Sequence, residues 1–587
     1  MIPCDPRLRV RLARVGQGLA PPDLLIHGCR VWNAFTGEVV AADVAICGDR
    51  IARIGLWTEP LGEGTRLLDG SGLVAVPGYI EPHTHPWPFL NPLNLGEAAV
   101  CRGTTCLVYD DLLLHLALGV ERLGILTAAI SARSLPHVFW TARIASQSRF
   151  EGEERVFSRG NAERLLRRPE FLATGEMTRW TDLLDPDRAL RLLEIVELAR
   201  GLGKFADGHT AGASVRRLPG LAAVGIRSCH EAIDAEEAVA RLRQGLWVLL
   251  RHSSLRLDLV HLLPALGEVG GSDRFAYTTD GAMAHFVEEN GFTDHLIRIA
   301  LNAGVAPHQA LRMATLNTAA YLGLDEDLGA VAPGRIAHVN LLRRIEEPTP
   351  EVVVCRGKVA ARGGALTEPP PSLSFEWGRY LQGGEAAVPE WDAPTFALPA
   401  SAPNPFPSAR LENAVITREE PIRLAPRDGG LWPAEEGAMA LALTDRSGRW
   451  ITRGVVTRFA PGLKALATSY TTNGGVLVAG TSPEAMASAL TRLREIGGGC
   501  VVVGPKGAPE TFPLPLAGIG CGGDFAAAAR ESRGFAEAMA RCGYAHADPN
   551  YTLLFFSCDF LPDLRAIEAG WVRVKTGEVL LPAQWFA

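Results

Sequence analysis

The central part of the chain, residues 79–330, alternates short apolar runs with longer stretches of helical period. Residues 189–202 and 235–244 are examples of the helical stretches, and the apolar runs between them have the length of buried strands. Strands alternating with helices over roughly 250 residues are typical of a (β/α)8 barrel. A doubly wound sheet is the alternative, but no Gly-x-Gly-x-x-Gly follows a strand. The pattern therefore predicts an α/β fold with a TIM-type barrel.

Segments of β character flank the predicted barrel on both sides. Residues 23–28 and 43–51 precede it as strand-like runs separated by Gly and Asp turns. Residues 332–342 and 352–359 follow it with the same character. We expect these runs to pair in one sheet, so that the barrel is inserted in a small β domain. The two parts of that domain are residues 1–78 and 331–365.

The last third of the chain predicts a separate domain. Residues 366–408 are rich in Pro, Ala and Glu, which is typical of a linker. Beyond them, a strand-like run over 475–480 is followed by a helical stretch over 483–496 and a second apolar run. We therefore expect a C-terminal α+β domain over residues 409–587.

One apolar run, Leu73–Ile80, leads into two histidines at alternating positions, His83 and His85. On a strand, residues i and i+2 point to the same side, so both imidazoles can reach one metal ion. The alternative is a pair of histidines in a Pro-rich turn. Four further residues of metal-ligand type stand at the ends of later apolar runs, and they are Glu176, His209, His230 and Asp280. A barrel brings its strand ends together at one face, so the order favours a shared metal site.

Composition narrows the class of protein. A chain of 587 residues is too long for one core, and two or three domains are expected. The net charge of -7 argues against a general nucleic-acid binder, because no basic excess is available to neutralise phosphates. No uninterrupted apolar segment reaches the length of a membrane span, and we expect no membrane association. The 11 cysteines lack any Cys-x-x-Cys pair, which favours reduced thiols in the cytoplasm.

The ordered ligand types resemble those of the amidohydrolase superfamily, and the chain is similar to its long-chain bacterial adenine deaminase family. Glu176 is informative, because many superfamily members place a carbamylated lysine where adenine deaminases place a glutamate. The stretches that carry the resemblance are Pro77–His85, Gly175–Met177, Asp207–Thr210, His230–Ala232, Thr279–Asp280, Arg312–Ala319, Glu495–Gly499 and Leu514–Gly518. They span nearly the whole chain, including the predicted C-terminal domain.

The resemblance implies two divalent metal ions, for which Mn, Fe and Zn all suit the donor types. The implied ligands are His83, His85 and Asp280 for one ion, His209 and His230 for the other, and Glu176 between them. The resemblance further implies a metal-bound hydroxide as the nucleophile. Asp280 takes its proton and delivers it to the leaving group, so the implied catalytic residues are Asp280, Glu176 and His230. The implied activity is deamination of adenine or a related nitrogen heterocycle.

Two departures from the family pattern bear on the substrate. The family's Asp-Pro-His-Glu stretch is replaced by Tyr109–Leu113, and its His-Asp-x-His-Asn stretch by Ser469–Asn473, which lacks both histidines. Hydrolysis of a cyclic amide or of another exocyclic substituent is therefore an alternative to deamination, and a non-enzymatic scaffold is a third. We predict that plain adenine is a poor substrate and that a differently substituted heterocycle is preferred. The competing interpretation is that other residues still bind adenine.

Three further residues are candidates for substrate binding. Arg251 follows an apolar run, Trp87 comes just after the histidine pair, and Asp110 stands in the first altered motif. An arginine could bind a carbonyl or a ring nitrogen, and a tryptophan could stack on a planar ring. A surface arginine and a tryptophan packed under a loop are the alternatives. We expect a small heterocyclic substrate as the only type of ligand besides metal, and a homo-oligomer, a dimer.

Overall fold

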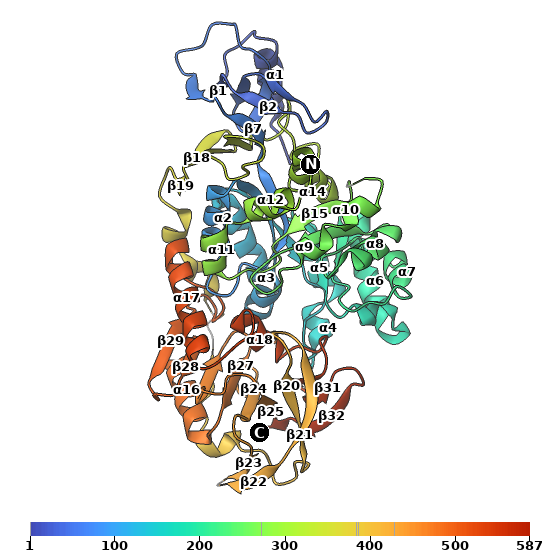
Figure 1. Cartoon of the computed structure of the whole chain (residues 1–587), viewed down its shortest axis with the longest axis vertical. Coiled ribbons are helices and arrows are strands. Elements are labelled where there is room, and N and C mark those ends of the chain that lie inside the picture. The colour runs from blue at the N-terminus through green and yellow to red at the C-terminus, as the bar shows by residue number, and fades with distance from the viewer. Residues whose placement is uncertain (1, 272, 383, 385–386, 428, 587) are drawn as a thin grey trace.

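Eight parallel strands form a barrel in the computed structural model, which describes residues 2–271, 273–382, 384, 387–427 and 429–586 (Figure 1). Five strands form one arc and three form the other, and parallel bridges Ala206–Ile226 and Thr84–Asp280 join the arcs at both ends. The strands are β8 (Tyr79–Thr84), β9 (Thr104–Asp110), β10 (His137–Ala142), β11 (Phe171–Met177), β12 (Phe205–Gly208), β13 (Ser228–Cys229), β14 (Trp247–Arg251) and β15 (Phe275–Thr278). The predicted fold class is confirmed.

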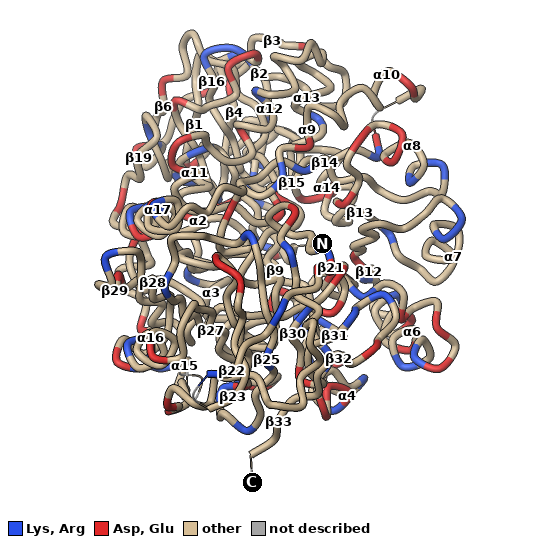
Figure 2. Tube along the Cα trace, turned by 60° about the horizontal axis from the view of Figure 1, so that its bottom comes forward, with Lys and Arg blue, Asp and Glu red and all other residues tan. Residues whose placement is uncertain are grey.

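Helices follow the strands and cover the outside of the barrel. They are α2 (Pro92–Cys101), α3 (Leu112–Arg133), α5 (Arg159–Leu166), α6 (Pro186–Gly201), α7 (Leu218–Ala223), α8 (Ala235–Arg243), α9 (Leu259–Leu262), α10 (Ala265–Glu268) and α11 to α14 between Ala284 and Leu322. Acidic and basic residues are interspersed along these outer helices (Figure 2).

Local capping chemistry sets where the helices begin. Helix α6 starts three residues before the expected stretch, because Asp185 accepts a hydrogen bond from the backbone of Asp187 and Pro186 occupies the first helical position. Proline is favoured there because its missing N–H would have no helical partner. Helix α8 begins as expected, with the Asp234 side chain accepting from the backbone of Glu237 at 2.9 Å. The caps therefore set the first residue of each of these helices.

Helix α3 has 22 residues and contains an 18-residue window with a mean hydropathy of 1.6, so it is long and apolar enough to cross a membrane by length and composition. The sequence pattern did not indicate this, because Glu121 and Arg122 interrupt the apolar run. In the fold, Leu123, Leu126 and Ile130 lie on its buried side and belong to the core of the barrel. A non-helical residue, Gly119, kinks the helix. Its apolar character is accounted for by packing against the barrel.

Strands from before and after the barrel pair with one another at one end of the molecule (Figure 1). β7 (Val74–Pro77) lies between β2 (Arg30–Trp32) and β16 (Val339–Leu342) in a seven-stranded sheet that also contains β3, β17, β18 and β19. A second sheet has the order β5-β4-β1-β6, from β1 (Leu24–His27) to β6 (Arg66–Asp69). The two sheets enclose a common apolar core. The chain enters and leaves the barrel through this region.

Three expected strands are divided or shortened by turns. Residues 43–51 form the hairpin β4 (Val44–Cys47) and β5 (Arg50–Ile54), and 352–359 form β17 (Val352–Cys355) and β18 (Lys358–Arg362). The second turn places Arg356 in the left-handed region with φ 50°, which the sequence pattern gave no reason to expect. The expected strand over 332–342 is wrong at its start, because Gly334 with φ 86° forms a turn. Ile336 then makes an isolated antiparallel bridge with Arg50, and the strand β16 begins at Val339.

A break at Gly78 separates β7 from β8, so the run leading to the histidines belongs to two sheets rather than one strand. A Cβ at Gly78 would lie 2.1 Å from Thr105 Oγ1 on the neighbouring strand β9. Only glycine allows the backbone to approach β9 this closely. The prediction of one continuous strand was wrong here, but β8 still carries the histidines to the far end of the barrel.

The C-terminal domain is a mixed sheet with helices packed on it (Figure 1). Its main strands run in the order β21-β20-β25-β24-β27-β26-β28-β29, from β20 (Phe406–Leu411) to β29 (Pro509–Pro513). Helices α16 (Pro483–Glu495) and α17 (Phe525–Arg541) cover it, and β30 (Leu564–Ile567), β31 (Gly570–Arg573) and β32 (Glu578–Pro582) form a smaller sheet. The short helix α18 (Pro549–Phe555) lies on the side of this domain that faces the barrel.

Candidate metal centre

The six residues expected as metal ligands lie together at the C-terminal ends of the barrel strands. Their positions are His83 within β8, His85 just beyond it, Glu176 within β11, and His209, His230 and Asp280 just beyond β12, β13 and β15. Parallel strands place their carboxyl ends at one face, which is why residues so far apart in sequence converge. The backbone N–H of His85 donates to the carbonyl of Asp280 at 2.8 Å, which closes the barrel at this point.

Glu176 lies at the centre of the cluster and is buried. Its Oε2 lies 2.8 Å from His209 Nδ1 and 3.3 Å from His230 Nε2. Its Oε1 lies 3.6 Å from His85 Nε2. Its Oε2 also lies 3.9 Å from His83 Nε2, so both carboxylate oxygens face imidazoles, as a ligand shared by two ions would need.

Asp280 faces the first histidine pair. Its Oδ1 lies 3.2 Å from His85 Nε2 and 3.6 Å from His83 Nε2, and its Oδ2 accepts a hydrogen bond from Arg251 at 2.9 Å. Its backbone lies in the left-handed region with φ 57°. Burial favours the neutral acid, but the adjacent imidazoles of His83 and His85 and the charge of Arg251 hold the pKa of Asp280 well below its ordinary value. The carboxylate is therefore ionised at neutral pH.

The donor set fits divalent metal. Three overlapping triads place one ligand atom from each member within 4.8 Å of the others, and they are His83, His230 and Asp280; His83, His85 and Glu176; and Glu176, His209 and His230. The buried Nε2 of His83 has no hydrogen-bond partner among the described residues, although carboxylates surround it. Imidazole nitrogen and carboxylate oxygen are the ligands that Zn²⁺ and related ions take. The cluster is therefore of the kind that holds divalent metal ions in proteins.

Asp207 orients the first of these imidazoles, and the sequence reasoning missed it. The Asp207 Oδ2 lies 2.9 Å from His83 Nδ1, which directs the opposite nitrogen of that ring into the cluster. Ser228 and Tyr321 donate to the other oxygen of Asp207 at 2.6 and 2.9 Å. Burial alone would raise the pKa of Asp207, but the contact with His83 lowers it to about 2. The available signal was its spacing, since Asp207 and His209 are at i and i+2 around the end of β12.

A buried arginine, Arg143, also went unrecognised in the sequence. Its guanidinium donates to Glu176 Oε1 at 2.5 Å, to the Glu176 carbonyl at 2.8 Å and to Asp110 Oδ2 at 2.5 Å. Asp110, a candidate for substrate binding, therefore pairs with this arginine, and its Oδ1 also lies 3.8 Å from His85 Nδ1. Arg143 fixes the orientation of the shared carboxylate from outside the cluster.

Arg251 lies between two carboxylates rather than free in the pocket. Its Nη1 donates both to Glu231 and to Asp280. Glu231 was not singled out in the sequence, although it directly follows His230, and its Oε1 lies 3.7 Å from His209 Nδ1. Burial raises the pKa of Glu231, but the nearby charges, Arg251 first among them, together outweigh burial and lower it to about 2. The floor of the site thus holds ionised carboxylates on both sides of this arginine.

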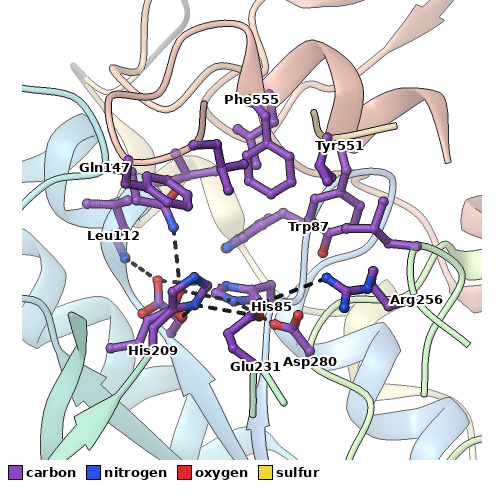
Figure 3. A pocket seen from close by; sticks show the side chains of 18 of the residues that line it. His85, Trp87, Leu112, Gln147, His209, Glu231, Arg256, Asp280, Tyr551 and Phe555 are labelled. Atoms are coloured by element: carbon purple, nitrogen blue, oxygen red, sulfur yellow. Dashed lines mark hydrogen bonds and ion pairs between the residues drawn. The ribbon is translucent and has the colours of Figure 1, made fainter. Parts of the chain in front are cut away.

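A pocket of about 760 Å³, including its open mouth, lies above the cluster. Asp280, Glu231 and His209 lie on the polar floor, and Tyr551 and Phe555 from helix α18 lie on the opposite side (Figure 3). The other apolar or aromatic wall residues are Trp87, Leu112, Leu113, Leu255, Val415, Tyr470, Leu554, Phe560 and Leu561. The candidate Trp87 therefore lines the pocket. A largely apolar cavity over a polar floor suits a heterocycle.

The comparisons with known proteins agree with this site. The amidohydrolase family model matches residues 224–360, and the adenine deaminase C-terminal domain model matches residues 414–578. A protein of Halalkalibacterium halodurans provisionally named adenine deaminase is 33% identical, with 98% of each chain covered. An adenine deaminase of Cenarchaeum symbiosum is 30% identical over 96% of this chain and 93% of its own. The chain belongs to the adenine deaminase family of the amidohydrolase superfamily.

Proposed function

We propose that this metal-dependent hydrolase of C–N bonds removes the exocyclic amino group of adenine or a related nitrogen heterocycle as ammonia. The observation that carries the proposal is the placement of Glu176 among four imidazoles, with Asp280 beside them and a largely apolar pocket above. The relatives named as adenine deaminases support the same reaction and favour it over cleavage of a cyclic amide.

The chain supplies the proton acceptor and holds it in place. Divalent ions, when bound, supply a water whose pKa is lowered to about 7, so that it reacts at neutral pH. Asp280 Oδ1 faces His83 and His85 at the floor, where it can accept a proton and return it to the departing amino group. Arg251 holds the other oxygen and keeps the carboxylate ionised between turnovers. The apolar roof limits the access of bulk water to the reacting carbon.

We propose two divalent ions, Mn, Fe or Zn. The overlap of the triads supports this number, because Glu176 belongs to one triad with His83 and His85 and to another with His209 and His230. The remaining ligand, Asp280, lies on the side of the first pair. Nothing in the donor types separates the three metals, since imidazole and carboxylate suit each of them.

We also propose that plain adenine is a poor substrate. Asp110 and Tyr470 of the two altered motifs line the pocket, but other polar groups of these motifs are paired within the protein, where Thr472 Oγ1 donates to the Ser557 carbonyl at 2.6 Å and Thr471 Oγ1 donates to Asn473 Oδ1 at 2.8 Å. Asp110 is held by Arg143. Groups paired in this way are not free for the ring nitrogens of a substrate. A kcat/KM for adenine of about 10⁵ M⁻¹s⁻¹ or more would contradict this expectation.

The test of the reaction class is ammonia release from a panel of aminopurines, aminopterins, cyclic amides and cyclic ureas. Deamination releases ammonia stoichiometrically, whereas opening of a cyclic amide releases none. Release from at least one amino-substituted ring, lost when metal is removed by a chelator and regained when metal is restored, is the expected result. Ring opening without ammonia would replace deamination with the cyclic-amide alternative.

We propose the domain division 1–78 with 331–365, 79–330, 366–408 as a linker, and 409–587, although strand β20 of the C-terminal sheet already begins at Phe406, inside the proposed linker. The pairing of β7 with β16 supports the insertion of the barrel into the small β domain. The chain is proposed to act in the cytoplasm, in keeping with cysteines that are all unpaired. A homodimer is proposed as its assembly, which sedimentation of the purified protein would test.

A further inference from the structure

The roof of the pocket contains a hydroxyl group with no protein partner. Tyr551, on helix α18 of the C-terminal domain, is 6% exposed, and its Oη is buried without a hydrogen bond to any described residue. Buried hydroxyl groups in folded proteins are normally paired. The ring packs within the apolar core and against Phe555, with centroids 5.7 Å apart, so packing accounts for the ring but not for the hydroxyl.

This hydroxyl reaches the floor of the pocket beside Asp280. A Cβ at the next residue, Gly281, would lie 1.5 Å from Tyr551 Oη and 2.7 Å from its Cζ. Any other residue at this position would displace the tyrosine, so glycine here makes room for a side chain from another domain. The C-terminal domain thereby places a polar atom next to the proposed proton acceptor.

The floor carries the carboxylates of Glu176, Glu231 and Asp280, and its guanidinium donors belong to Arg143 and Arg251. Arg143 and Nη1 of Arg251 donate to these carboxylates, while Nε and Nη2 of Arg251 have no hydrogen-bond partner among the described residues. An aminopurine-type ring carries unprotonated nitrogens, which need donors. A ring nitrogen that faces the C-terminal domain therefore needs a donor from that domain.

We propose that the Tyr551 hydroxyl donates a hydrogen bond to a ring nitrogen of the bound heterocycle and so helps determine which heterocycle is accepted. This inference rests on the proposed function. A tyrosine hydroxyl can donate in this position, and its rigid ring is held by α18. A second buried donor without a partner, Trp87 Nε1, lines the same pocket. The substrate thus meets acceptors from the barrel below and a donor from the C-terminal domain.

The test compares Tyr551→Phe with Tyr79→Phe. The Tyr79 hydroxyl is also buried, but it donates to the Pro348 carbonyl at 2.6 Å at the start of β8, away from the pocket. Tyr551→Phe should lower kcat/KM by about 10-fold to 100-fold, because a buried ring nitrogen loses its partner, and should leave metal content and melting temperature unchanged. Tyr79→Phe should lower the melting temperature and leave kcat/KM unchanged.

A substrate analogue adds a measurement that a structural role would not affect. Each analogue in a series replaces a different ring nitrogen by C–H, and wild type and Tyr551→Phe are assayed on every analogue. For one of the ring nitrogens, its replacement should lower the kcat/KM of wild type by about the same factor as Tyr551→Phe lowers kcat/KM on the parent compound. Tyr551→Phe should have the same kcat/KM on that analogue and on the parent compound. If Tyr551→Phe and the replacement of each ring nitrogen lower kcat/KM independently, so that their factors multiply for every analogue, the proposal is overturned.

The outcomes separate this inference from the proposed function. If wild type releases ammonia and Tyr551→Phe keeps kcat/KM within twofold of wild type, the role of Tyr551 is refuted and the reaction stands. If loaded wild type releases no ammonia from any amino-substituted ring, the proposed function and this inference both fall. A selective loss in Tyr551→Phe, with the melting temperature retained, supports both.

Discussion

Replacement of Arg143 by methionine offers a sharp test of how the centre is held together. Methionine keeps an unbranched side chain of similar length but removes the charge and every donor. Asp110 and Glu176, both nearly fully buried, then lose their shared cation. Burial opposes charge on both carboxylates, so each must find another partner or take up a proton.

The expected loss is large in the metal-free protein. Removing one partner of a buried ion pair typically costs about 3–5 kcal/mol, because the other charge stays buried and unpaired. For a domain of about 150–250 residues, each kcal/mol lowers the melting temperature by roughly 2–4 °C. We therefore expect Arg143→Met to lower the melting temperature of the metal-free barrel by about 6–20 °C. Bound divalent ions neutralise Glu176, so the loss should be smaller in the loaded protein.

Scanning calorimetry of chelator-treated and metal-loaded protein measures both quantities. The matched control is Arg164→Met, which removes an exposed pair with Glu121 and should cost less than about 1 kcal/mol. Arg143→Lys restores the charge without the planar fork, and an intermediate melting temperature is expected. Metal-free Arg143→Met melting within about 2 °C of wild type would refute the argument, since a buried pair of this kind could not then be holding the carboxylates.

Three further predictions concern the metal, the proton acceptor and pH. Elemental analysis of active protein should find about two divalent ions per chain, and active protein without metal would end this interpretation. Asp280→Asn should lower kcat by about 10²–10⁴-fold with the fold retained, and near-normal turnover with metal confirmed would remove Asp280 from the mechanism. Burial raises the pKa of Glu97 to about 7, so the folded chain keeps a proton that the unfolded chain releases above pH 4.5. Wild type should therefore lose up to about 3 kcal/mol relative to Glu97→Gln as pH rises from 4.5 through 7, and parallel urea midpoints across that range would contradict this.

The barrel could be predicted because the alternation of strands and helices is regular, and strand ends in a parallel barrel share one face. The spacing of His83 and His85 allowed a shared metal site with a Pro-rich turn as the alternative, and the resemblance ordered the six residues expected as ligands. A domain boundary was expected at residue 78, but the division of the apolar run into strands of two sheets was not, because it follows from the close approach of Thr105 on another strand. The turn at Arg356 was hidden for a related reason, since arginine rarely takes a left-handed conformation.

The residues that hold the ligands were harder to find, because their partners are distant in sequence. Arg143 lies 33 residues from both Asp110 and Glu176, and no spacing rule connects a strand-end arginine with carboxylates on the two neighbouring strands. Arg251 was a candidate for substrate binding, but the sequence could not show that its guanidinium donates hydrogen bonds to Glu231 and Asp280. Buried charges are tolerable only when paired, and their pairing is settled by three-dimensional packing.

Residues of two domains line the pocket. The barrel provides a floor of ligands and acceptors at strand ends, and the C-terminal domain provides an apolar roof with Tyr551. Polar contacts fasten the two around the pocket, including Ser254 Oγ donating to Asp548 at 2.6 Å and Arg149 donating to Asp559 at 2.8 Å. Because the reacting groups lie on one domain and the proposed ring contact on the other, changes in α18 can alter the preferred heterocycle without altering the metal ligands. If Tyr551 makes the proposed contact, substrate choice depends on the domain interface as well as on the residues proposed to hold metal.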